Sequence, residues 1–336
     1  MSDDTKDKGV VLLTTLLVMA VMAAVSVALI DQIRFAIKRA GNVQAFAQAD
    51  WYLKGAEDFA EQYLSEQLGE FDGPARNLAL QSGIPAILPI DGGTISLFVR
   101  DGGQCVSLNS VIRGQAGLLR QLFETIGWSP VDAAQIMPII QDWVDEGAQV
   151  LPGGAEDFTY LGRDPAYRTP NAPFTSFTEL RLLEGMSEER YRSIRPFACV
   201  REIPEGDETS GTAGSEININ TLTPAQAPLL AAILGGVNYL QQAEQLILDR
   251  PSEGYTSESL RASPIVIDIQ DENSSGNFLD YLTFEPQYFW VEARIDYLSA
   301  TRIAAFEFSI ENDQLTRLYR GLGEEALRPI ITSVTP

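Results

Sequence analysis

The 336-residue sequence contains no histidine. This absence excludes hydrolases that use imidazole as the catalytic base, zinc sites with histidine ligands and haem held by a proximal histidine. Basic residues are also few, with 24 Lys and Arg against 46 Asp and Glu, and the net charge of −22 repels polyphosphate. We therefore expect no nucleic acid among the partners, and the charge favours cationic partners or bound cations.

Motifs of common enzymes are missing as well. The sequence has neither a G-x-S-x-G nucleophile motif nor a P-loop, and carboxylates alone are a weak indication of acid–base catalysis. We predict that the protein is not an enzyme. Its composition, 45% hydrophobic with 18 Pro and 27 Gly, is typical of a folded chain. At this length we expect two or three compact units and an appendage.

The appendage is an uncharged run from Val10 to Ile30. Its 21 residues, at about 1.5 Å each, cross a hydrocarbon core of roughly 30 Å. The run is longer than the apolar core of a signal peptide, about 7–15 residues, and no A-x-A-type cleavage site follows it. We predict a retained transmembrane helix over residues 10–30. Lys6 and Lys8 favour a cytoplasmic N-terminus, but three basic residues on the far side oppose it, so charge leaves the orientation open.

Beyond Asp31 the apolar residues become periodic at steps of three and four, which is typical of an amphipathic helix. We predict one helix from about residue 10 to about residue 68, with its first half in lipid and its second half packed on a soluble domain. The simpler interpretation is a membrane anchor followed by an ordinary domain helix.

The polar leader before this helix ends at Lys8-Gly9. A short leader that ends in glycine directly before an apolar helix resembles the prepilin-type signal of type IV pilins and type II secretion pseudopilins. The resemblance implies that prepilin peptidase cleaves between Gly9 and Val10 and methylates the amino group of Val10. It also implies a single-pass protein of the bacterial inner membrane with a periplasmic C-terminal domain.

Further features indicate which family of pseudopilins the sequence resembles most. The fifth residue after the predicted cut is Thr14, where most pilins have glutamate, and the segment from Asp142 to Tyr160 is similar to a D-W-x-D…G-A-E-x-x-Y pattern. With the chain length, these features resemble the large minor pseudopilins of the GspK (general secretion pathway protein K) family. The resemblance implies a place at the pseudopilus tip, where the protein assembles with GspI and GspJ, initiates and caps the pseudopilus, and contacts the secretin or exported proteins.

Two alternatives remain at this point. The first is a tip minor pilin of a type IV pilus or DNA-uptake system, which genetic neighbourhood and DNA binding would distinguish. The second is a membrane-anchored periplasmic hydrolase, which would require an activity that is lost on changing Asp142 or Glu156.

The soluble region combines strands with a helical insertion. Alternating residues predict a hairpin of residues 94–100 and 105–109, and a C-terminal meander of residues 288–297, 302–310 and 315–319. The predicted fold class is α+β: a pilin-like N-terminal helix packed on an antiparallel sheet, interrupted by a large α-helical insertion with helix-hairpin-helix-like or SAM-like features. The predicted divisions are a leader (1–9), a transmembrane part (10–30), the periplasmic helix and first strands (31–107), an inserted domain of two SAM-like subdomains (108–285) and the C-terminal strands (286–336).

The insertion contains a repeated pattern. Leu108-Asn109-Ser110 and the leucines that follow correspond, at an offset of 111 residues, to Ile219-Asn220-Thr221 and its apolar residues. The pattern predicts an internal duplication, although any two amphipathic helices with similar starts share some of it.

An acidic, glycine-rich stretch suggests a metal site. Asp142, Asp145, Glu156 and Asp157 supply the carboxylate oxygens that calcium prefers, and calcium binding occurs in the family that the chain resembles. We expect structural calcium there. Alternatively, Asp145 is simply solvated and Asp142 stabilises a turn. A second acidic loop, residues 268–273, is another candidate.

The two cysteines, Cys105 and Cys199, fall in the part predicted to be periplasmic. Because that compartment is oxidising, we expect a disulfide between them. Two separate buried thiols are the alternative.

Overall fold

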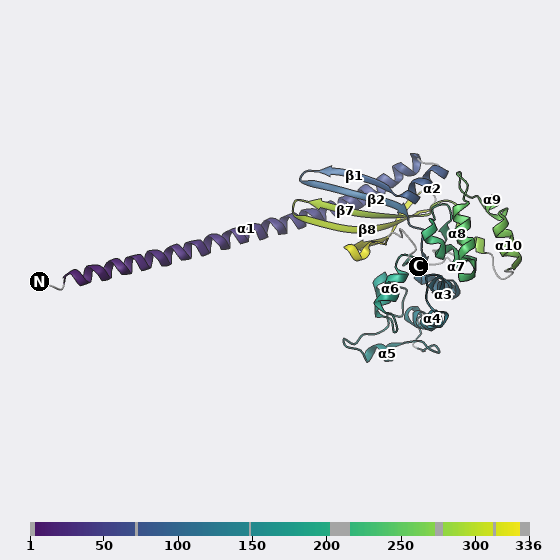
Figure 1. The fold of residues 1–336 in the computed structure, drawn as a ribbon, viewed down its shortest axis with the longest axis horizontal. Coiled ribbons are helices and arrows are strands. Elements are labelled where there is room, and N and C mark those ends of the chain that lie inside the picture. Colours follow the sequence, from purple (N-terminus) through teal and green to yellow (C-terminus); the bar gives the residue numbers. More distant parts are fainter. Residues whose placement is uncertain are drawn as a thin grey trace.

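The computed structural model describes residues 4–70, 73–147, 149–201, 216–272, 278–311 and 314–329. Helix α1 (Asp4–Glu70) has 67 residues and is therefore about 100 Å long. It projects far beyond the rest of the protein at its N-terminal end (Figure 1). The predicted continuous helix over residues 10–68 is confirmed, and α1 already begins within the predicted leader.

The second half of α1 packs on an antiparallel sheet. Its buried face consists mostly of alanines, which allow the helix backbone to lie close to the strands. The residues of this face are Ala45, Ala49, Leu53, Ala56, Ala60 and Leu64. They share one hydrophobic core with the inward side chains of the sheet, such as Val291, Phe306 and Phe308.

The sheet has five strands in the order β1-β2-β7-β8-β9, and every neighbouring pair is antiparallel. After α1, helix α2 (Gly73–Ser82) leads into the first strand. The strands are β1 (Ile84–Ile90), β2 (Gly93–Asp101), β7 (Tyr288–Tyr297), β8 (Ala300–Glu311) and β9 (Gln314–Leu322). The predicted C-terminal meander is confirmed as β7, β8 and β9.

The predicted hairpin of residues 94–100 and 105–109 is wrong in its second arm. Strand β2 exists, but it pairs with β1 and β7. The sequence of β1 contains Pro85 and Pro89, which made it look unlike a strand; proline is tolerated there because β1 is an edge strand. Of residues 105–109, only β3 (Val106–Ser107) is extended, and it pairs in parallel with β4 (Ala198–Cys199).

A helical unit lies between β2 and β7 in the sequence, and it occupies the end of the sheet away from the N-terminus of α1 (Figure 1). Its α-helices are α3 (Ala116–Thr125), α4 (Pro130–Val144), α5 (Asp157–Leu161), α6 (Glu188–Ile194), α7 (Ala227–Leu234), α8 (Leu240–Leu248), α9 (Ser257–Arg261) and α10 (Pro264–Glu272). Its 3-10 helices are η1 (Leu108–Arg113), η2 (Phe177–Leu182), η3 (Pro224–Gln226), η4 (Val237–Tyr239) and η5 (Phe278–Tyr281). The unit has its own hydrophobic core, so the predicted α+β class with a helical insertion is confirmed.

Two short parallel strand pairs divide this unit. The first module, residues 106–199, begins with β3 and ends with its partner β4. The second module, residues 217–283, begins with β5 (Ile217–Asn218) and ends with its partner β6 (Leu282–Thr283). The two starting strands are offset by the same 111 residues that the sequence pattern indicated, and α3 packs against its counterpart α7.

A buried asparagine holds each module in the same way. The side chain of Asn109 accepts a hydrogen bond from Phe174 N (2.8 Å) and donates to the carbonyls of Phe174 (3.0 Å) and Arg201 (2.8 Å). That of Asn220 accepts from Tyr255 N (2.7 Å) and donates to the carbonyls of Tyr255 (2.9 Å) and Phe284 (3.0 Å). The repeated use of one side chain supports the duplication.

Candidate functional site

No described part of the protein covers the N-terminal part of α1. Its apolar side chains from Val10 to Ile30 are all exposed, and α1 is the only helix in the described residues that is long and apolar enough to cross a membrane. Both residues of the predicted cleavage site, Gly9 and Val10, lie inside this helix. The hydroxyl of Thr14 donates to the carbonyl of Val11, so it is satisfied within α1.

Further along, α1 combines attachment to the sheet with an exposed side. Buried Glu57 pairs with Arg317 and Arg320 of β9 (3.4 Å to Arg320), which ties the helix to the last strand. On the outer side Trp51 remains 66% exposed. A long helix with an exposed apolar side is suited to packing against other helices.

The predicted metal ligands gather only in part. Asp142 near the end of α4 is fully buried and accepts hydrogen bonds from Leu151 N (3.1 and 3.3 Å). Its burial raises the pKa of its carboxyl, and the negative charge of Asp145 raises it further. Asp145, just after α4, is half-buried and accepts a bond from Gly147 N.

Glu156 is also buried, and one of its oxygens, Oε1, has no hydrogen-bond partner in the described part of the protein. Burial raises the pKa of its carboxyl, and the charges of Asp142 and Asp145 add to this effect. Asp157 differs, because its oxygens are taken by Arg168 (2.7 Å) and by the backbone and hydroxyl of Thr169.

These observations bear on the predicted calcium. Within the described residues, no group of three or more Asp, Glu, Cys or His side chains is arranged to hold a metal ion. The uncompensated charges of Asp142, Asp145 and Glu156, and the free oxygen of Glu156, do fit a cation that would also take backbone carbonyls and water as ligands. Calcium at this loop stays a prediction.

The second acidic candidate is not a loop. Residues 268–272 belong to helix α10, so the backbone there does not form the loop that the sequence suggested. Asn273, the last residue of that candidate, lies outside the described residues.

The cysteines lie where the first module meets the sheet. Cys105 and Cys199 form a disulfide. Two residues beyond Cys199, the guanidinium of Arg201 lies against the face of the sheet opposite α1. There it pairs with Glu307 of β8 at 3.0 Å. Both side chains are almost fully buried. Burial disfavours the charged form of Arg201, but the negative charge of Glu307 favours it, and the pKa of Arg201 is raised.

Two more arginines complete this junction. Arg328 lies 3.5 Å from Glu307, and burial together with the neighbouring guanidinium groups lowers its pKa to about 10. Arg100 of β2 pairs with Glu292 at 3.0 Å and donates to the carbonyl of Arg328. Sequence reasoning missed this network, because its members are scattered over more than 220 residues without a common pattern.

Comparisons with known proteins decide the family. Two family models, both described as type II secretion system (T2SS) protein K, match residues 104–203 and 217–260. The chain is 32% identical to the type II secretion system protein K of Klebsiella pneumoniae over 75% of its own length and 78% of that protein. This chain belongs to the type II secretion system protein K family. The two models match the first and second modules in turn.

Other members of the protein K family agree. The Pseudomonas aeruginosa protein is 32% identical over 74% of each chain. A solved complex of GspK, GspI and GspJ from enterotoxigenic Escherichia coli contains a chain of the same fold, with a TM-score of 0.67 and 22% identity over 85% of this chain and 99% of that chain. The predicted minor pseudopilin role in type II secretion is thereby confirmed, and the pilus or DNA-uptake alternative finds no support in these matches.

Proposed function

We propose that this protein occupies the tip of the type II secretion pseudopilus, where it assembles with partners of the GspI and GspJ kind, initiates the pseudopilus and caps it. Its role is assembly and not catalysis. The observation that carries the proposal is the position of the helical unit, at the end of the protein away from the N-terminus of α1 (Figure 1). A bulky unit there would obstruct a further subunit above it.

The orientation and processing follow from the same proposal. The leader lies in the cytoplasm, prepilin peptidase cleaves between Gly9 and Val10, the new amino group of Val10 is methylated, and the body is periplasmic. In a filament that grows by adding subunits below the tip, Thr14 needs no charge to neutralise a terminal amine above it. The helical unit would then face the secretin or exported proteins.

Processing is tested by intact mass and N-terminal peptide analysis from cells with and without prepilin peptidase. A peptidase-dependent, methylated Val10 is the expected result. An uncut Met1, or cleavage after Ile30, would contradict the proposed processing.

Assembly is tested by purifying the full chain in detergent with the GspI- and GspJ-type pseudopilins of the same secretion system. We expect a stable three-protein complex that Trp51→Ser weakens, because Trp51 lies on the exposed side of α1. Phe158→Ser is the matched control: Phe158 is an aromatic residue with 92% exposure on α5, in the helical unit. Absence of the complex with the wild-type chain would refute the partners.

A calcium site at the acidic loop is part of the proposal, with the buried carboxylates of Asp142 and Glu156 as protein ligands beside backbone carbonyls and water. A bound cation would compensate the charges that now raise the pKa values of Asp142 and Glu156. After treatment with chelator, calcium should raise the unfolding temperature of the wild-type chain by several degrees more than magnesium does, in line with selective binding to the folded state. Glu156→Gln should abolish this shift, and Glu146→Gln, at an exposed neighbour, should keep it. No calcium shift in the wild type would exclude the site.

A further inference from the structure

The two edges of the five-stranded sheet differ in how they are protected. Strand β1 carries Pro85 and Pro89, and proline has no N–H to offer to another strand. Strand β9, at the opposite edge, is nine residues long, contains no proline and pairs along one side only, with β8, in the described part of the chain. Of the two edges, β9 is therefore the one able to accept a further strand.

The side chains of β9 sort onto two faces. Arg317, Arg320 and Leu322 lie opposite Phe308, Phe306 and Ala304, which belong to the core under α1, so they share the face of the sheet that α1 covers. Arg317 and Arg320 pair with the single carboxylate of Glu57. Two cations share one anion, so this edge keeps a local positive charge on a protein whose net charge is −22.

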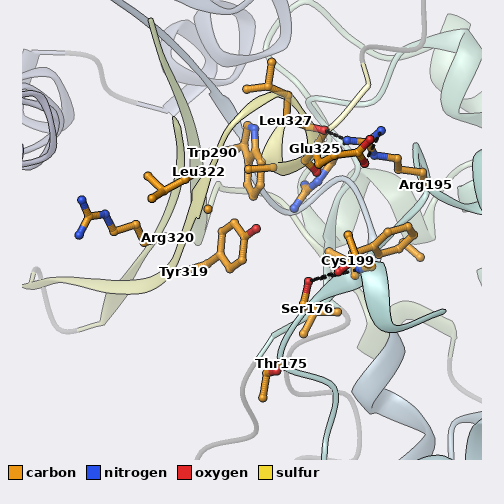
Figure 2. A pocket seen from close by; sticks show the side chains of 17 residues that line it. Thr175, Ser176, Arg195, Cys199, Trp290, Tyr319, Arg320, Leu322, Glu325 and Leu327 are labelled. Atoms are coloured by element: carbon orange, nitrogen blue, oxygen red, sulfur yellow. Dashed lines mark hydrogen bonds and ion pairs between the residues drawn. The ribbon is translucent and has the colours of Figure 1, made fainter. Parts of the chain in front are cut away.

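On the other face of β9 there is a cavity of about 380 Å³ between the sheet and the first module. The rings of Trp290 and Tyr319, stacked with centroids 5.8 Å apart, line its sheet side, and Ser176 and Cys199 lie across from them (Figure 2). Arg320 and Leu322 also line the cavity, and Figure 2 shows their side chains on the other side of the strand from Tyr319. The strand thus presents cations on one face and an aromatic-lined cavity on the other.

We propose that β9 binds an extended segment of a partner protein as a sixth strand. Side chains of an added strand alternate between the two faces. The segment that fits has acidic residues on the face of Arg317 and Arg320 and an apolar residue on the other face, where it enters the cavity beside Trp290 and Tyr319. Backbone hydrogen bonds to β9 supply affinity, and the alternation of acidic and apolar residues supplies specificity.

A second copy of the chain is a poor occupant. Pairing β9 with β9 would bring Arg317 and Arg320 of both copies together, and the overall charges of two copies repel each other. A different protein with an acidic, extended segment matches the charge and the cavity.

This contact would serve assembly or export in type II secretion, so it rests on the proposed function. The test uses the full chain in detergent and overlapping 12-residue synthetic peptides that cover the other components of the same secretion system and its exported proteins. We expect at least one peptide with alternating acidic and apolar residues to bind and to slow amide hydrogen exchange in residues 314–322, but not in β1.

Two variants sharpen this test. Leu322→Asp adds a negative charge at a 63% exposed site on β9 and should weaken peptide binding about tenfold through like-charge repulsion. Ile87→Asp changes an equally accessible, 71% exposed site on β1 and should leave binding unchanged. Failure of every peptide to bind, protection elsewhere than β9, or equal effects of both variants would overturn the proposal. Because the three-protein complex forms through α1, Leu322→Asp should still assemble it, so failure of the complex and failure of the β9 contact are separate results.

Discussion

The two helical modules share one structural plan, and the loop after the second long helix of each shows how they differ. In both, a two-residue parallel strand pair closes the module and a buried asparagine joins its segments. In the first module, the end of α4 and the loop that follows it hold the buried acids Asp142 and Glu156. The loop after α8 in the second module instead carries Arg250, which donates to the carbonyls of Ile219 (3.2 Å) and Leu222 (2.8 Å).

The comparison distinguishes features that the fold of both modules requires from features that are present in one module only. The shared asparagines satisfy backbone groups that any version of the module buries, so neither copy has lost them. The loop after α4 or α8 can differ between the modules, because different charged side chains can serve its polar groups. The second module places the cation Arg250 in this loop, whereas the first module places the buried acids Asp142 and Glu156 at the corresponding position.

The disulfide belongs to the first module alone, and its loss should have the largest effect. Replacing Cys105 and Cys199 by serine together removes a bridge across 94 residues and should lower the free energy of unfolding by about 2–4 kcal/mol. Urea unfolding of the double variant and of the wild type, each with and without reductant, measures this. Reductant should destabilise the wild type and leave the variant unchanged; equal stability of both oxidised chains would contradict the prediction.

Substitution of Asn109 and Asn220 tests whether the two modules are structurally equivalent. Asn109→Ala and Asn220→Ala each leave a buried N–H and two carbonyls without their partner, and each should cost about 2–3 kcal/mol. Asn238→Ala, at an exposed position in the second module, is the control and should cost little. If urea unfolding shows a large loss for only one of the two buried sites, the modules are less equivalent than their hydrogen bonds indicate.

Arginines of the two loops should behave differently. Arg250→Met removes two hydrogen bonds to half-buried carbonyls and should cost about 1–2 kcal/mol. Arg168→Met, in the first module, breaks only an exposed pair with Asp157 and should cost less than about 0.5 kcal/mol. Thermal unfolding of both variants gives the comparison, and a cost for Arg168 as large as that for Arg250 would refute it.

Acid should reveal the smallest difference. The pKa values of Asp142 and Glu156 are raised in the folded state. At pH values between the ordinary carboxyl pKa and these raised values, the folded state therefore binds more protons than the unfolded chain does. Their contribution to stability is present at low pH and is lost as pH rises through the raised values. Without calcium, the unfolding temperature of the wild type relative to Glu156→Gln should therefore increase from about pH 7 to about pH 4. Glu253→Gln, in the second module, should follow the wild type.

Local patterns in the sequence predicted much of the fold. The uncharged run and the apolar periodicity after it predicted α1, the alternation of residues 288–319 predicted the meander, and the offset between Asn109 and Asn220 predicted the repeat. Strand β1 was missed because Pro85 and Pro89 are compatible with a strand only at an edge, and a sheet edge is a tertiary property.

The sites were harder to predict than the fold. Composition and spacing singled out Asp142 and Glu156, but they could not show that Asp157 is turned toward Arg168. The Arg201–Glu307 pair and the open edge of β9 depend on which distant segments meet, and no local pattern encodes that.

The place where the helical unit joins the sheet has one more consequence. The chain leaves β2 at Asp101 and returns to β7 at Tyr288, and these adjacent strands are in register, with Asp101 opposite Phe289. Gly102 N donates to the carbonyl of Tyr288 at 2.8 Å, so the two ends of the insertion touch. Both modules together therefore stand where the turn of a β-hairpin would be, and a short linker between β2 and β7 in their place would leave the sheet topology intact.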